Sequence, residues 1–228
     1  MAHQYFSNEF QEDNGVLILD RDDKYVANFG KQWRDHVDIQ IDSKNNFSCS
    51  QDLLENVIFS KLDYFNNKSV LEIGCGAGRF SEHIVKHAKE LILVDLSQAI
   101  FFNVAQSEKN CIRIKADFLK LIPAKKFDIV ICRGVLQHTP SPADSIKKLY
   151  EFVKPDGEVV FDIYPPPKVG FLSPKYLIWR PLFKNFIKYE SCETFLINNI
   201  KILLSIKRII RKIFFNSRFI SDCFIPVY

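Results

Sequence analysis

The hydrophobic positions follow one regular plan over residues 51–167. Leucine, isoleucine, valine and phenylalanine recur at helical spacing across residues 51–65, which predicts an amphipathic helix. Short apolar runs then alternate with helix-compatible segments. We expect strands at 70–73, 91–95, 112–115, 128–132 and 158–163, and helices at 79–88, 98–108 and 143–153. This alternation predicts an α/β fold with a mostly parallel sheet and helices on both of its faces.

The first predicted strand leads into a glycine-rich loop. Gly74, Gly76 and Gly78 occupy alternate positions after it, and Glu72 stands two residues before them. Glycine serves where φ must be positive or where a ligand touches the main chain. The dinucleotide fingerprint G-x-G-x-x-G would need a glycine where this chain has Arg79. A carboxylate facing the loop suits a ligand with an ammonium and a sulfonium group, and it opposes a pyrophosphate.

Four more motifs follow in order. The second strand ends at Asp95, the third is followed by Asp117, and the fourth leads into a loop that runs from Arg133 to His138; a helix, turn and strand span residues 149–161. With the glycine loop, this series resembles the class I S-adenosylmethionine-dependent methyltransferases, and among them the bacterial enzymes of sugar and polysaccharide gene clusters. The resemblance implies a Rossmann-like fold and S-adenosyl-L-methionine as the cofactor.

The resemblance also implies a set of site residues at the carboxyl ends of the strands. Asp95 would accept hydrogen bonds from the ribose hydroxyls, and Asp117 would lie near the adenine amino group. The expected cofactor-binding residues are Glu72, Gly74, Cys75, Gly76, Gly78, Asp95, Leu96, Asp117, Phe118 and Arg133. We expect no metal site.

His138 is the candidate general base for a hydroxyl acceptor, because the ordinary pKa of histidine lies near neutrality. The alternative is a loop histidine that shapes the pocket or caps the helix that begins near Pro142. Arg133 and Tyr164 are candidates for orienting an anionic or hydroxylated substrate, and a structural role explains each of them equally well.

The segments on either side of this domain differ from it. Residues 1–50 lack a clean periodic pattern, but Phe29 to Trp33 resembles a segment that closes over the cofactor in the sugar-cluster relatives; simple packing of the two aromatics is the alternative. We expect an N-terminal extension covering the cofactor site (1–50), an S-adenosylmethionine-binding domain (51–167) and a helical insertion or lid (168–228).

The C-terminal segment is basic, with 11 Lys and Arg against 3 Asp and Glu over residues 168–228. Residues 197–215 predict one amphipathic helix with a basic face. Three roles are open for such a helix. It is a membrane-surface helix on anionic lipids, a lid helix with a solvated basic face, or a helix that contacts an anionic substrate such as a nucleotide-linked sugar.

The class I fold closes with a sixth and a seventh strand, and only five strand candidates are visible. We therefore expect the terminal strands to be missing, either because the polypeptide is truncated or because residues 216–228 supply an edge.

Composition narrows the functional classes. Hydrophobic residues make up 47% of the chain and charged residues 25%, as in ordinary soluble proteins. Residues 1–23 do not predict a secretory signal, no apolar run is long enough to span a bilayer, and the six cysteines form no C-x-x-C pair. We expect a cytoplasmic protein, with peripheral contact to the inner face of the membrane as an option for 197–215.

The function we favour is methyl transfer to a small molecule, a hydroxyl of a sugar, nucleotide-sugar or related metabolite. The alternatives are a methyltransferase for RNA or protein and a non-catalytic cofactor-binding scaffold. Nucleic acid is the less favoured partner, because the lysines among the aromatics of residues 171–189 are more commonly used to cover apolar surface. The sequence does not define an oligomeric state.

Overall fold

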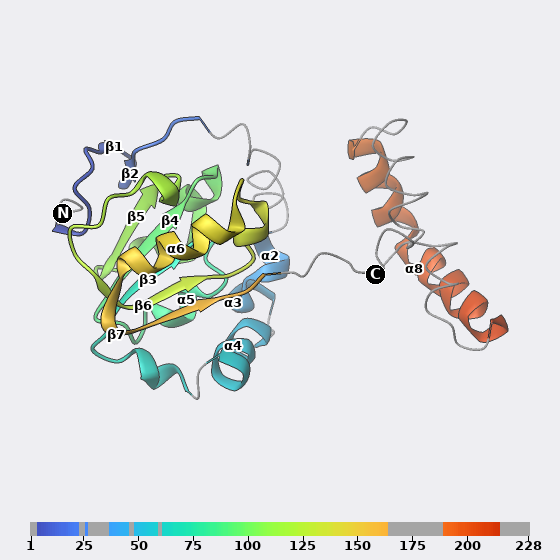
Figure 1. The fold of residues 1–228 in the computed structure, drawn as a ribbon. Helices are drawn as coiled ribbons and strands as arrows, with labels where there is room; N and C mark the ends of the chain where they lie inside the picture. The colour runs from blue at the N-terminus through green and yellow to red at the C-terminus, as the bar shows by residue number, and fades with distance from the viewer. Residues whose placement is uncertain are drawn as a thin grey trace. The chain divides into compact units, whose positions relative to one another are not determined.

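The computed structural model describes residues 4–22, 26, 37–45, 48–58, 61–163 and 189–214. The chain forms two compact units, Met1–Ile163 and Tyr164–Tyr228. The first contains a seven-stranded sheet with the order β1-β2-β5-β4-β3-β6-β7 (Figure 1). Phe29, Trp33 and Tyr164 lie outside the described residues, and so do residues 215–228.

The five predicted strands form the parallel part of this sheet, as expected. They are β3 (Ser69–Ile73), β4 (Glu90–Asp95), β5 (Cys111–Lys115), β6 (Phe127–Cys132) and β7 (Val153–Phe161). Each pairs in parallel with its neighbours in the order β5-β4-β3-β6-β7. β3 is the central strand of the five, and every one of its residues is buried. Its residues are therefore apolar except for Ser69 and Glu72.

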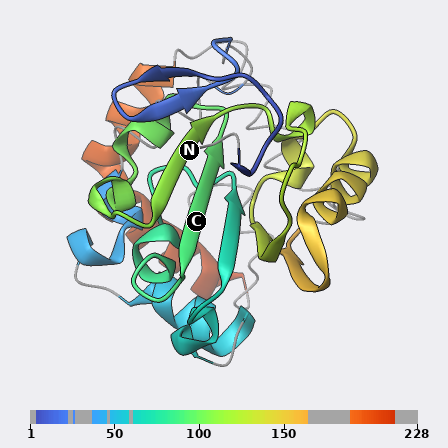
Figure 2. The same cartoon turned by 90° about the vertical axis from the view of Figure 1, so that its left-hand side faces the viewer.

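Two further strands come from the N-terminal segment, where the sequence patterns predicted no strand. β1 (Gln11–Asp13) and β2 (Val16–Ile18) form an antiparallel hairpin, and β2 pairs in parallel with β5. The turn between them is Asn14-Gly15, with φ of 49° and 71°. Asn-Gly with two positive φ angles matches the twist of a hairpin. Figure 2 shows this blue hairpin along the edge of the sheet.

The added strands therefore lie beside β5, at the edge opposite β7. Within the described residues β7 pairs only with β6. The edge expected from residues 216–228 lies outside the described part of the chain.

The helices of the first unit are shorter than predicted, with one exception. Pro142–Phe152 forms α6, whose N-cap Ser141 accepts a hydrogen bond from the main-chain N–H of Asp144. The segment 79–88 contains only α5 (Ser81–Ile84), and 51–65 divides into α4 (Cys49–Leu53), the π-turn η2 (Leu54–Ile58) and the 3₁₀ turn η3 (Leu62–Phe65). Lys61, with extended backbone, stands between the last two.

The predicted helix 98–108 is two 3₁₀ turns, η4 (Gln98–Phe102) and η5 (Val104–Ser107). Asn103 separates them with φ −58° and ψ 128°. Its fully buried side chain accepts a hydrogen bond from the N–H of Ala105 and donates one to the carbonyl of Gly76. Because that carboxamide bonds to the main chain of the glycine loop, the helix is interrupted at this residue.

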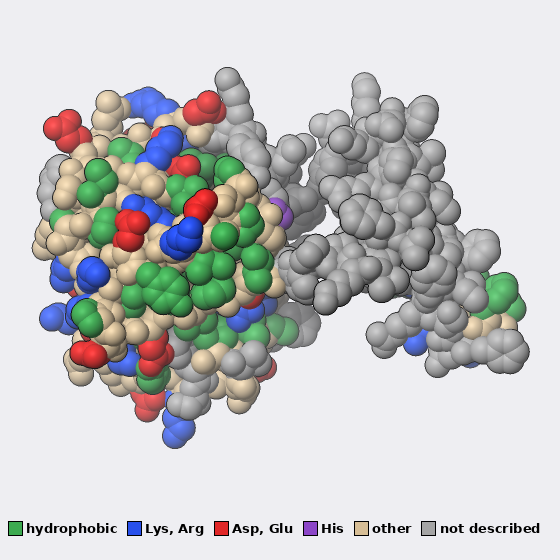
Figure 3. All heavy atoms as spheres, viewed as in Figure 1, with side chains coloured by type: hydrophobic (Ala, Val, Ile, Leu, Met, Phe, Trp, Pro, Cys, Tyr) green, Lys and Arg blue, Asp and Glu red, His purple; other side chains and the backbone are tan. Residues whose placement is uncertain are grey.

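Apolar clusters cover both faces of the sheet. One contains Phe6, Phe127 and Phe152, with the rings of Phe6 and Phe152 edge to face at 6.1 Å between centroids. The other contains Phe65 and Ile84. In Figure 1, α6 crosses one face of the sheet. On the face shown in Figure 3, basic, acidic and hydrophobic side chains of this unit are intermixed.

The described part of the second unit is α8 (Tyr189–Ile213), which extends the predicted helix toward the N-terminus. Among its described side chains, the exposed large hydrophobic ones are Phe195, Ile202, Ile206, Ile209, Ile213 and, just beyond its end, Phe214. Among the described residues, no helix is both long and apolar enough to cross a membrane.

Candidate functional site

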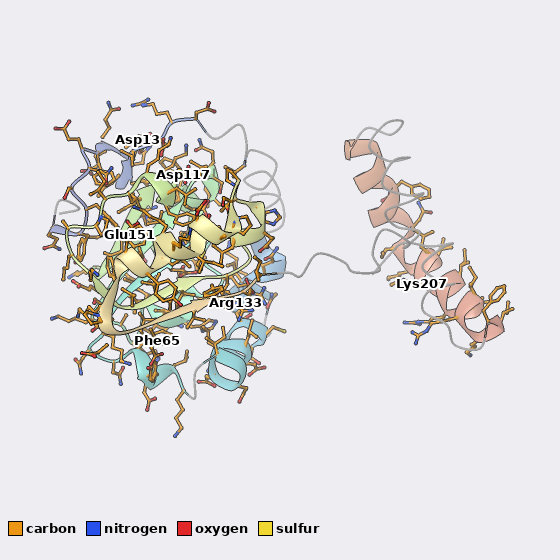
Figure 4. The ribbon with its side chains drawn as sticks, in the orientation of Figure 1. Asp13, Phe65, Asp117, Arg133, Glu151 and Lys207 are labelled. Carbon is orange, nitrogen blue, oxygen red and sulfur yellow. The ribbon has the colours of Figure 1, made fainter. Side chains whose placement is uncertain are left out.

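A cavity of about 420 Å³ opens where β3, β4, β5 and β6 end. Its volume lies in the range that holds small molecules and cofactors. Nine of the predicted site residues line it: Glu72, Gly74, Cys75, Asp95, Leu96, Asp117, Phe118, Arg133 and His138. Figure 4 marks Asp117 and Arg133, which follow β5 and β6.

The glycine loop forms the floor of this cavity at the end of β3. Gly74 has φ of +73°, and a Cβ atom there would lie 2.0 Å from Cγ2 of Val135. Gly78 has φ of +105° and a comparable conflict at 2.7 Å with Oδ1 of Asn103. The two glycines are thus required both by backbone conformation and by the close approach of neighbouring loops. Gly76 and Gly78 support the loop without lining the cavity.

Glu72 lies in β3 beneath this loop. It is 3% exposed, and its Oε2 accepts a hydrogen bond of 2.7 Å from the hydroxyl of Ser81. Burial raises the pKa of Glu72 to about 8, against the lowering effect of the Ser81 hydrogen bond, and the negative charge of Asp95 adds to the rise. A cation placed beside this carboxyl group would favour its charged form.

Asp95 ends β4 and ties the glycine loop to the next turn. Its Oδ2 accepts a hydrogen bond of 2.7 Å from the N–H of Gly76, and its Oδ1 accepts two of 2.7 Å from the N–H and the hydroxyl of Ser97. Burial raises the pKa of Asp95, while the bonds from Ser97 and Gly76 oppose the rise. A carboxylate has about four acceptor positions, so Asp95 retains acceptor capacity toward the cavity.

Asp117 and Phe118 begin the turn η6 (Phe118–Lys120) after β5. Oδ1 of Asp117 accepts a hydrogen bond of 3.0 Å from the N–H of Leu119, which holds the carboxylate in place. The N–H of Asp117 donates to Oδ2 of Asp20, so the chain just beyond the N-terminal hairpin braces this wall.

The β6 side of the cavity carries the positive charge. Arg133 pairs with Asp162, with 2.8 Å between Nη2 and Oδ2. The guanidinium carbons of Arg79 and Arg133 lie 5.2 Å and 5.9 Å from the ring centroid of Phe80. Both arginines and Phe80 line the cavity. Arg79, Phe80 and Ser97 were not predicted as site residues, although the first two directly follow the glycine loop.

His138 closes the turn η7 (Leu136–His138), and its N–H donates to the carbonyl of Val135 at 2.8 Å. It is exposed and lines the cavity together with Thr139 and Pro140. The imidazole therefore has access both to the cavity and to solvent, as a group that exchanges protons must.

Cys75 also faces the cavity but is 2% exposed. Burial raises the pKa of its thiol well above the ordinary value, with the charges of Asp95 and Glu72 adding to the effect. The thiol therefore stays protonated, which excludes a thiolate nucleophile here.

The N-terminal segment contributes Val26 and Gln40 to the cavity wall, and sequence patterns did not single out either. Gln40 ends α2 (Val37–Gln40), and the buried Asp42 begins α3 (Asp42–Asn45). Oδ2 of Asp42 lies 3.1 Å from Nε2 of His83, and Glu82 accepts a hydrogen bond from the N–H of Asp42 at 2.9 Å. These bonds fasten α3 to α5.

Ligand atoms of Asp42, Glu82 and His83 lie within 4.8 Å of one another, a grouping that can hold a metal ion. Oδ2 of Asp42 already accepts hydrogen bonds from the main-chain N–H groups of Ser50 and Gln51. The hydrogen bonds within this cluster account for its geometry, and it supports docking of the N-terminal segment.

Comparison with known proteins agrees with this architecture. The family model described as "Methyltransferase domain" matches residues 50–185. The solved "DhpI-SAM-HEP complex" superposes with a TM-score of 0.50 at 16% identity, covering 65% of this chain and 69% of that one, which supports the fold alone.

Two curated relatives are similar in sequence. Ubiquinone biosynthesis O-methyltransferase of Coxiella burnetii (strain RSA 493 / Nine Mile phase I) is 32% identical over 99 residues, which are 41% of this chain and 42% of the relative. The protein of that name from Neisseria meningitidis serogroup A is 32% identical over 117 residues, which are 44% and 48%. The chain spans less than half the length of these relatives. Neither is named for a sugar substrate, so the resemblance to sugar-cluster enzymes stays a prediction. Because the family model matches more than half of the chain, this protein belongs to the methyltransferase-domain family.

Proposed function

We propose that this chain binds S-adenosyl-L-methionine and transfers its methyl group to a hydroxyl of a small molecule, a sugar or a related metabolite. The observation that carries the proposal is the cavity wall at the ends of β3, β4 and β5. There, Gly74 lines the cavity together with three acidic residues, Glu72, Asp95 and Asp117. Both curated relatives are also named as O-methyltransferases.

The residues fit this cofactor on chemical grounds. Gly74 lines the cavity, and because a side chain there would collide with Val135, only glycine lets the main chain lie this close to the loop that contains Val135. Glu72 supplies a carboxyl group for an ammonium, and Asp95 keeps acceptor capacity for hydroxyl groups. When bound, the cofactor supplies a methyl group on a sulfonium, a centre with a good leaving group.

The protein's contribution is then to orient the acceptor and exclude water. The buried apolar strands beneath the cavity and the loop 133–140 above β6 provide a partly dry enclosure. His138 accepts the proton of the acceptor hydroxyl in this proposal, because the imidazole faces both the cavity and solvent. A non-enzymatic scaffold would bind the cofactor equally well but would not depend on His138.

A methyl-transfer assay tests the proposal. The full chain is incubated with methyl-labelled S-adenosylmethionine and a panel of hexoses, sugar phosphates and phenols, and labelled product is counted. We expect Asp95→Ala to abolish transfer and His138→Gln to lower kcat about 10²-fold or more with S-adenosylhomocysteine affinity retained. Glu151→Ala, on the far end of α6, is the control. Transfer that is equal in wild type and Asp95→Ala would contradict the proposal.

We also propose that α8 contacts an anionic membrane surface. Its exposed hydrophobic side chains Phe195, Ile202, Ile206, Ile209 and Ile213 recur at intervals of three, four and seven residues, which places them on one stripe. Lys201, Arg208 and Lys212 are exposed, recur at intervals of seven and four, and flank that stripe. No acidic residue occurs between 194 and 213. An apolar stripe with cations on its flank fits the interface of a bilayer with anionic lipids.

Vesicle sedimentation tests this second proposal. We expect the full chain to bind phosphatidylglycerol vesicles more tightly than phosphatidylcholine vesicles. Replacing Lys201, Arg208 and Lys212 by glutamine should weaken that binding about 100-fold, at about 1 kcal/mol per charge near the surface. A control with the same change in net charge replaces the exposed Lys86, Lys109 and Lys147 of the first unit. Equal loss in both variants would assign the effect to net charge and contradict the role of α8.

A further inference from the structure

The charges around the cavity are sorted by strand. Asp117 follows β5, Asp95 ends β4 and Glu72 lies in β3, while Arg133 follows β6. Since the sheet order is β5-β4-β3-β6, the three carboxyl groups and the arginine succeed one another across the cavity. Arg79 joins the cationic end, because its guanidinium packs against Phe80 as Arg133 does.

The two arginines differ in how their charge is balanced. Arg133 forms an ion pair with Asp162, using Nη2 at 2.8 Å and Nε at 3.1 Å from the same oxygen. Arg79 donates from Nε to the hydroxyl of Ser50 at 3.1 Å and has no carboxylate partner among the described residues. A guanidinium has five N–H donors, so four N–H groups of Arg79 have no partner among the described residues, at a half-buried position that lines the cavity.

Arg79 is also held in one orientation. Ser50 is 1% exposed, and its own N–H donates to Asp42 at 2.8 Å. Asp42 is in turn bonded to His83. On its other side, the guanidinium lies over the ring of Phe80. Because the side chain of Arg79 is already ordered, it loses little additional conformational entropy when an anion binds.

We propose that Arg79 is the subsite for an oxyanion of the methyl acceptor, a carboxylate or a phosphate, and that it makes the enzyme selective for acidic acceptors. This inference rests on the proposed function. The planar fork of arginine matches the two oxygens of either anion. The anion binds at the cationic end beside Arg133 and His138, and the carboxyl-lined end remains for the cofactor, whose sulfonium and ammonium are positive.

The test is calorimetric titration of the full chain saturated with S-adenosylhomocysteine. The probes are glucose, glucose 6-phosphate and glucuronate, so that one sugar is compared in neutral, phosphate and carboxylate forms. We expect tighter binding of one or both anions than of glucose. Arg79→Gln should weaken anion binding at least about tenfold, in line with a charge-assisted hydrogen bond, and leave glucose unchanged. Arg79→Lys should retain part of the preference. The control is Lys147→Gln, at an exposed position on α6.

Each remaining outcome overturns the inference. Equal affinity of the wild type for all three sugars, or anion binding that Arg79→Gln leaves intact, removes Arg79 as an acceptor subsite. Arg79→Gln could instead weaken the binding of S-adenosylhomocysteine and leave that of 5′-methylthioadenosine, which lacks the amino acid carboxylate, unchanged. That result would assign Arg79 to the cofactor. If the wild-type chain does not bind S-adenosylhomocysteine, the proposed function itself is contradicted. That failure is therefore distinguishable from a failure of the inference about Arg79. Far-UV circular dichroism of Arg79→Gln and Arg79→Lys confirms that both variants fold.

Discussion

Replacing Glu72 by glutamine should make the protein more stable, by an amount that grows with pH. Glutamine has nearly the same shape and keeps an oxygen that accepts the hydrogen bond from Ser81. It removes the ionisable group that burial holds at a pKa of about 8, against an ordinary value of 4.5. The variant therefore isolates the effect of this one carboxyl group on the free energy of unfolding.

The magnitude follows from proton linkage. Between the two pKa values the folded protein holds the proton of Glu72 and the unfolded chain has released it. Folding then takes up a proton, so the contribution of this group to the free energy of unfolding falls as the pH rises through that window. At about 1.4 kcal/mol per pH unit, flattening near the folded pKa, the fall from about pH 5.5 to about pH 8.5 is about 3 kcal/mol.

Equilibrium urea denaturation, followed by far-UV circular dichroism, measures this effect. The free energy of unfolding of Glu72→Gln minus that of the wild type should increase by about 3 kcal/mol over the same pH range, because the other titrating groups cancel in the difference. A difference that stays constant with pH would refute the reasoning, since Glu72 would then titrate as an exposed carboxyl group. Asp144→Asn, at a surface carboxyl group on α6, is the control for the substitution itself.

Two further substitutions test the glycine loop. Gly74→Ala should lower the free energy of unfolding by roughly 2–5 kcal/mol, because it adds a steric conflict with Val135 to the strain of a positive φ. Gly134→Ala, with φ of +71° and open space around its Cβ, should lose only about 1–2 kcal/mol; equal losses in urea denaturation would contradict the steric part. Asn103→Ala should cost about 1–3 kcal/mol and speed hydrogen exchange of the loop around Gly76, since it removes buried hydrogen bonds; unchanged exchange there would show that Asn103 does not hold the loop.

Sequence patterns predicted the parallel part of the sheet because β3, β4 and β6 are largely apolar and buried, and because turn signals separate the strands. They also predicted most of the cavity wall, since residues at the carboxyl ends of parallel strands meet at one edge. Nine of the predicted residues line the cavity, while Gly76 and Gly78 shape the loop from outside it. Their roles in cofactor binding stay predictions.

The errors arose where tertiary contacts outweigh local pattern. Asn103 breaks a helical period in order to bond the glycine loop, and no local signal reveals that partner. The hairpin β1–β2 has strands of only three residues, too short for a period of two to stand out, although Asn14-Gly15 is a turn signal. Gln40 lines the cavity two residues before Asp42, which is anchored on α5. Long-range bonds of this kind are not encoded in sequence spacing.

Calorimetric titration of the wild-type chain and of Asp95→Ala with S-adenosylmethionine, S-adenosylhomocysteine and NAD tests the cofactor assignment most directly. We expect one molecule of either adenosyl compound to bind per chain and NAD to give no heat of binding. Asp95→Ala should lower the affinity for both adenosyl compounds at least about tenfold, because it removes a hydrogen-bonded carboxylate from the cavity wall. Heat with NAD and none with the other two, or affinities that Asp95→Ala leaves unchanged, would contradict the assignment of this cavity to S-adenosylmethionine.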